Sequence, residues 1–129
     1  MIGNLERAFG RMLQMKAQVR TAYLRLEESG YAPEEDSFDP SPPDAPADVV
    51  NDLSTLKTLI DAIKTEVGAL DEAGCMVKNI DEGIADWPTR RHGREILLCW
   101  KLGEKEVTHW HEVDAGFAGR RSICEFDTD

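Results

Sequence analysis

The sequence predicts an α+β domain, in which two long helices pack as an antiparallel pair and a small antiparallel β-meander follows. Apolar residues recur at helical spacing in residues 1–28 and 49–74, an acidic proline-rich stretch separates these segments, and the apolar period shortens to about two beyond Gly74. A chain of 129 residues, 41% of them hydrophobic, is long enough for one modest core. We therefore expect a single domain over residues 1–129.

The first predicted helix, residues 1–28, carries an apolar stripe with steps of three and four, interrupted at Lys16. The stripe consists of Ile2, Leu5, Phe9, Met12, Val19, Tyr23 and Leu26. Leu13, Met15 and Leu24 fall outside it. This helix thus has more apolar surface than one partner covers, which favours a second contact with the sheet or with another subunit.

The second predicted helix, residues 49–74, has an uninterrupted heptad stripe. It comprises Val49, Leu53, Leu56, Ile60, Ile63, Val67 and Leu70. Asp48 is a plausible N-cap after Pro46, and Gly74 suits the position that follows a helix end. Between the helices, residues 29–48 hold five of the six prolines, six acidic residues and no basic ones. We interpret them as a solvated linker rather than as a motif for a proline-recognising domain.

Residues 75–121 have strand-like periodicity and turn signals, with a tail at 122–129. The expected strands are 75–80, 84–87, 95–102 and 107–113, joined by a turn at 81–83, a loop at 88–94 and a turn at 103–106. This pairing places Trp100 opposite His109, Leu98 opposite His111 and Cys99 opposite Trp110. Both histidines would then share a face with Ile96. A short helix over residues 106–113 remains an alternative.

The same region resembles a bacterial family known only as domain of unknown function 2203. The resemblance lies in the stretches "GIADWP", "GRE", "LCWKLGE", "WHE" and "GFAGR". It implies a helix that ends in glycine, followed by short strands and turns. No activity is established for that family, so the resemblance implies none here.

Charge and composition exclude several classes of protein. The formal net charge is −10 and the pI is near 4.7, which disfavours nucleic-acid binding. No apolar run is long enough to span a bilayer, and charge follows the N-terminus too closely for a signal peptide. Cys75, Cys99 and Cys124 are well separated and predicted to be reduced. We expect a cytoplasmic protein.

Two histidines and a cysteine are the candidates for metal binding or catalysis. His109 and His111, with Glu112, Asp114 or Cys99, could supply metal ligands, but H-x-H is a weak signal. Packing against tryptophan is the favoured interpretation for these histidines. A thiol in an apolar strand is a poor nucleophile. We therefore predict no catalytic residue, no metal and no cofactor.

Five arginines form the remaining candidate, a site for a small anion. Arg90, Arg91 and Arg94 share one loop, and Arg120 and Arg121 follow the glycines of "GFAG". The interpretation that we favour is instead that these arginines pair with the chain's own carboxylates, such as Asp86, Glu112 and Asp114, and balance their charge at the surface.

Taken together, these features favour a non-enzymatic interaction or scaffold module that self-associates as a homodimer and has a possible further protein partner. The alternative is a small enzyme or sensor that binds a small anion or a metal at the arginine and histidine end of the sheet.

Overall fold

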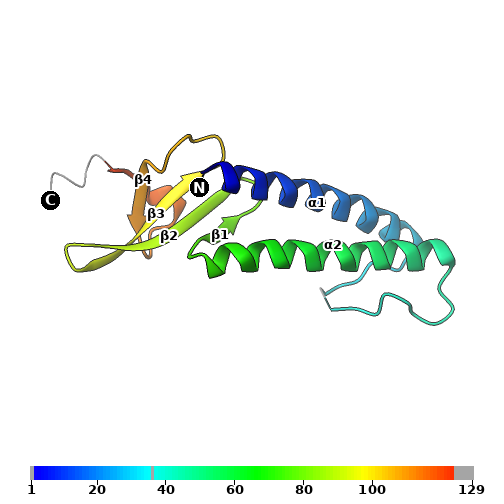
Figure 1. Cartoon of the computed structure of the whole chain (residues 1–129). Coiled ribbons are helices and arrows are strands. Elements are labelled where there is room, and N and C mark those ends of the chain that lie inside the picture. The colour runs from blue at the N-terminus through cyan, green and yellow to red at the C-terminus, as the bar shows by residue number, and fades with distance from the viewer. Residues whose placement is uncertain (1, 36, 124–129) are drawn as a thin grey trace. The chain divides into compact units, whose positions relative to one another are not determined.

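The computed structural model describes residues 2–35 and 37–123, which form two helices followed by a five-stranded antiparallel sheet (Figure 1). The predicted α+β fold class is confirmed. The elements are α1 (Ile2–Ser29), α2 (Ala47–Glu72), β1 (Met76–Asn79), β2 (Ile84–Arg91), β3 (Arg94–Lys101), β4 (His109–Glu112), a 3-10 turn (Phe117–Gly119) and β5 (Arg121–Ser122). They belong to two compact units. One unit comprises residues 10–66, and the other comprises the residues up to Phe9 together with those from Val67 onward.

Within the unit of residues 10–66, α1 and α2 run antiparallel. Arg11 forms an ion pair with Glu66 at 2.7 Å, and Arg25 forms one with Asp52 at 2.8 Å, so the beginning of one helix lies beside the end of the other. The buried core of this unit is apolar and consists of Leu26, Val49, Leu53 and Leu56. The predicted stripes therefore meet as expected, because each places its large side chains on one side of its helix.

Both helices end in the same motif, in which a glycine adopts positive φ. Gly74 has φ 88°, its N–H donates to the Asp71 carbonyl, and the Cys75 N–H donates to the Leu70 carbonyl. The predicted role of Gly74 is confirmed. The predicted N-cap is wrong, because α2 starts at Ala47 and Asp48 lies in its first turn, where a carboxylate stabilises the helix dipole instead.

The β2–β3 hairpin is longer than the sequence suggested. Residues 88–94 were expected to form a loop, but the strands pair up to Arg91 and Arg94, and only His92 and Gly93 form the turn. Both turn residues have positive φ, which matches the twist of the flanking strands. Pro88 is tolerated inside β2 because the recorded pairing with β1 extends only to Asp86, which leaves Pro88 at an edge.

The register between β3 and β4 differs from the prediction by one residue. Cys99 lies opposite His109, Leu98 opposite Trp110 and Leu97 opposite His111. The cause is a longer connection, residues 102–108, which the side chain of Glu104 holds by accepting a hydrogen bond from the Lys101 N–H at 2.7 Å. The helical alternative for residues 106–113 is wrong, since His109–Glu112 is a strand.

A slip of one residue exchanges the faces of a strand. The histidines consequently lie on the face of Leu97 and Cys99 and not, as expected, on that of Ile96. The opposite face carries Trp100, which is fully buried and contacts Phe9 of α1 with ring centroids 5.8 Å apart.

β5 was not predicted. Its Arg121 pairs with Trp110 of β4, so the sheet continues where the sequence suggested a loop and a tail. Among the described residues, neither helix has the length and hydropathy needed to cross a bilayer.

Candidate functional site

The candidate site is a cluster of three buried polar side chains from three neighbouring strands: Asp86 of β2, Cys99 of β3 and His111 of β4. Asp86 is 2% exposed, His111 1% and Cys99 0%. One potential ligand atom from each residue lies within 4.8 Å of the other two. The strand register explains this arrangement, because Asp86 faces Cys99 directly and His111 is the diagonal neighbour of Cys99.

Both ring nitrogens of His111 are engaged. Nδ1 lies 2.7 Å from the Glu112 carbonyl oxygen, and Nε2 lies 2.9 Å from Oδ2 of Asp86. A carbonyl oxygen only accepts, so Nδ1 carries a hydrogen and donates it. Nε2 and the Asp86 carboxylate therefore lie at hydrogen-bonding distance from each other in the interior of the protein.

Asp86 has spare hydrogen-bonding capacity. Its second oxygen, Oδ1, is buried and has no hydrogen-bond partner among the described residues. Buried carboxylate oxygens are nearly always satisfied, because desolvating one without a partner costs a few kcal/mol. This oxygen lies in a cluster that also contains a histidine and a thiol.

The third member of the cluster is a buried thiol, Cys99. Burial, reinforced by the neighbouring Asp86 carboxylate, raises the pKa of Cys99 to about 12. The predicted lack of nucleophilic character agrees with this shift. Burial also raises the pKa of Cys75 to about 11. Both cysteines are free, and Cys124 lies outside the described residues.

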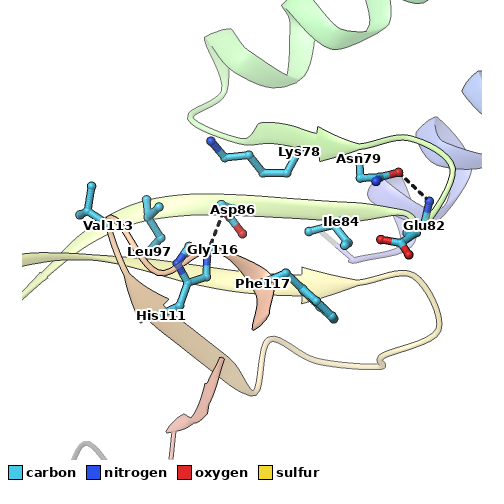
Figure 2. Close-up of a pocket in the computed structure, with 10 residues that line it drawn as sticks. All are labelled: Lys78, Asn79, Glu82, Ile84, Asp86, Leu97, His111, Val113, Gly116 and Phe117. Atoms are coloured by element: carbon cyan, nitrogen blue, oxygen red, sulfur yellow. Dashed lines mark hydrogen bonds and ion pairs between the residues drawn. The ribbon is translucent and has the colours of Figure 1, made fainter. Parts of the chain in front are cut away.

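A pocket of about 300 Å³ adjoins the cluster, with Asp86 and His111 in its lining (Figure 2). Apolar side chains from the sheet and from the segment after β4 form much of the rest: Ile84, Leu97, Val113 and Phe117. Lys78, Asn79 and Glu82 lie at the β1 side of the pocket. Glu82 belongs to the turn predicted at residues 81–83, yet it contributes to this pocket.

The two histidines have different surroundings. His109 contacts Thr108 through Nδ1 at 2.9 Å and lies 3.6 Å from a Glu104 carboxylate oxygen, whereas His111 joins Asp86. The sequence offered Cys99 as one of several possible further ligands, and the structure places it with His111. Glu112, another possible ligand named from the sequence, forms an ion pair with Arg94 at 3.1 Å. The H-x-H pair is thus divided between two environments.

The arginines proposed for an anion site have several different partners. Arg94 pairs with Glu112, as the surface-balance alternative expected, and Arg120 pairs with Glu104 at 2.7 Å. Arg90 donates to the Gly93 carbonyl within the hairpin, and the Arg121 guanidinium lies 5.4 Å from the Trp110 ring centroid. Arg91 lies in the same hairpin, at the last position of β2. Asp86, which was named as an arginine partner, instead pairs with His111. Anion binding stays a prediction.

Glu104 is a second residue whose role the sequence did not reveal. Burial opposes its ionisation, but hydrogen bonds from Arg120 and the Lys101 N–H outweigh that effect and lower its pKa. Its backbone carbonyl also accepts from Nε1 of Trp100 at 2.8 Å. This residue therefore fixes the β3–β4 connection, on which the register of the site depends.

Sequence reasoning missed Asp86 because its two partners lie 13 and 25 residues away along the chain. A signal was present nonetheless. Asp86, Cys99 and His111 all occur in stretches that carry the family resemblance, "GIADWP", "LCWKLGE" and "WHE".

Comparison with known proteins identifies a family and no characterised relative. No curated protein and no solved structure matches the chain. Residues 1–123 match the model of a family described as "Uncharacterized conserved protein (DUF2203)". Because this match covers nearly the whole chain, the protein belongs to the DUF2203 family of uncharacterised conserved proteins.

Proposed function

We propose that this protein is a non-enzymatic interaction module of the cytoplasm that self-associates through its helical pair. The chemistry of the cluster supports binding over catalysis. Among the described residues of the cluster, Cys99 is held as a thiol and both nitrogens of His111 are occupied. Neither group is available as a nucleophile or a general base. The two buried free thiols fit a reducing compartment.

The observation that carries self-association is apolar surface left over on the helices of the 10–66 unit. Leu24 is 48% exposed, and Leu13 on the same helix is only partly buried. These two residues are eleven positions apart, about three helical turns, so they face the same side. Leu59 and Ile63 of α2 are also partly exposed. A second copy of the chain would bury such a surface by a symmetric contact.

We expect a dimer at micromolar concentration, measured by size-exclusion chromatography with light scattering. Leu24→Glu should raise the dimer dissociation constant at least tenfold, since burial of a leucine is worth about 1.5–3 kcal/mol. Gln18→Glu, an exposed position on the same helix, is the matched control and should leave the constant unchanged. A monomer mass at the highest attainable concentration would refute the proposal.

A second candidate function is a sensor for a small ligand. The specific observation in its favour is the pocket beside an unpaired, buried Asp86 oxygen. Such a site is concave, largely apolar and provided with a few polar groups that would orient a ligand. The module would then report occupancy of the pocket to its partner.

Thermal melting in the presence of a chelator tests the sensor for organic ligands and anions. The panel consists of small amines, phosphate, sulfate and common nucleotides, and it compares the native protein with an Arg94→Ala, Arg121→Ala double variant. If the pocket is the site, amines should raise the melting temperature of both proteins alike. Stabilisation by an anion that disappears in the double variant would instead locate the site at the arginines.

A further inference from the structure

We infer that Asp86, Cys99 and His111 form a zinc site whose fourth coordination position opens toward the pocket. This inference names the ligand of the sensor proposed above and rests on that second candidate function. It differs from the prediction made from sequence, which expected no metal because the chain lacks four ligands at a recognised spacing. The present ligands come from three strands, so their spacing along the chain carries no zinc-binding signature.

The orientation of His111 is the first argument. Histidines that bind a metal usually donate their other ring N–H to a carbonyl or carboxylate, which fixes the tautomer and the direction of the free nitrogen. His111 does this through Nδ1, which donates to the Glu112 carbonyl, and its Nε2 points at the Asp86 carboxylate. The nitrogen needed for coordination is therefore already aimed into the cluster.

The position of the Asp86 carboxylate is the second argument. Its Oδ2 lies 2.9 Å from Nε2 of His111, so a divalent cation bound by these two residues would have one oxygen and one nitrogen ligand that are already close together. Oδ1 of Asp86, buried and without a partner among the described residues, offers a further donor atom to the ion. The metal would satisfy an oxygen that the protein alone leaves unsatisfied.

The geometry and the donor types favour zinc. In a tetrahedral site with bonds of about 2.0–2.3 Å, ligand atoms are roughly 3.3–3.8 Å apart. The three atoms lie within 4.8 Å of one another, so small side-chain rotations bring them into range. One nitrogen, one sulfur and one oxygen suit zinc and not calcium or magnesium, which prefer oxygen.

The pocket supplies the open position. Asp86 and His111 line it, so a fourth ligand, either water or a small donor molecule, can reach the ion from that side. Zinc ions that bind an exchangeable ligand typically have three protein ligands and one open coordination position, whereas structural zinc ions are coordinated by four side chains.

The test is titration of the full-length, chelator-treated protein with zinc, followed by calorimetry in buffers of different ionisation enthalpy. We expect one zinc per chain and the release of the thiol proton of Cys99. Cobalt in place of zinc should give a thiolate-to-metal charge-transfer band. Asp86→Asn and Cys99→Ser should each weaken binding at least about 100-fold, and Cys99→Ser should remove the band.

His109→Gln, Cys75→Ser and Cys124→Ser are the matched controls, and they should bind zinc as the native chain does. Absence of binding by the native protein, or binding that survives Cys99→Ser, would overturn the zinc site. The melting panel contains chelator, so it tests ligand binding in the absence of zinc. If zinc does not bind but an amine raises the melting temperature in that panel, the zinc site is refuted and the sensor proposal stands. A loss of both responses would refute the sensor as well.

Discussion

Replacing Asp86 with alanine should lower the free energy of unfolding of the metal-free protein by about 3 kcal/mol, whereas asparagine should cost about 1 kcal/mol or less. Alanine leaves Nε2 of His111 buried without a partner and opens a small cavity. Asparagine keeps the shape, and its amide N–H can donate to an unprotonated Nε2 while Nδ1 still donates to the Glu112 carbonyl. Denaturant unfolding in the presence of chelator measures both variants.

Asp114→Ala is the control for the loss of one negative charge. Asp114 is exposed, so its replacement should change stability by less than about 0.5 kcal/mol. Equal costs for the alanine and asparagine variants of Asp86 would contradict the hydrogen-bond assignment at His111. The combination of retained stability and lost zinc affinity in Asp86→Asn would separate the structural role of this residue from its role as a ligand.

The second large effect is expected in alkaline solution, where the buried thiol of Cys99 couples folding to pH. An unfolded thiol ionises near its ordinary pKa of 9.0, whereas the folded pKa is about 12. Between these values the native state binds more protons than the unfolded state, so stability falls as pH rises. From pH 8 to 10.5 the contribution of this residue should be a loss of about 2 kcal/mol.

Comparison with Cys99→Ala isolates that contribution from the lysines and tyrosines that ionise in the same range. The variant should lose about 2 kcal/mol less than the native protein over this interval. Cys75→Ala is a second reference, because burial raises the pKa of Cys75 to about 11. Removing this thiol should reduce the fall in the free energy of unfolding with pH only up to about that pH. Parallel curves for the native protein and Cys99→Ala would show that this thiol is not kept from solvent.

The helices were predictable because their apolar stripes extend over many turns and end at glycine. Gly74, for example, follows shortly after the last residues of the apolar stripe, and glycine adopts its φ of 88° without strain, so stripe and glycine together predict the helix end. The hairpin turn was less accessible, since His92 occupies a position of positive φ that asparagine or glycine more often takes. The strands around it were consequently read as a loop.

The candidate site was not predictable, because it depends on register. Period-two patterns establish that alternate residues share a face, but they do not establish which face lies opposite which in the next strand. Here the register depends on the connection between β3 and β4, in which the Glu104 side chain accepts hydrogen bonds from the Lys101 N–H and from Arg120. Only with that connection in place does His111 lie beside Asp86.

The β3–β4 connection, residues 102–108, therefore has an evolutionary consequence that is unusual for a surface loop. Loops commonly gain and lose residues freely. Here a single insertion or deletion, unless a bulge absorbs it, would turn β4 over, carry Trp110 to the polar face and remove His111 from Asp86. A shift of two residues would restore the faces but would move His111 two positions along the strand, away from Asp86. Members of the family that keep the three polar residues should accordingly keep the length of this loop.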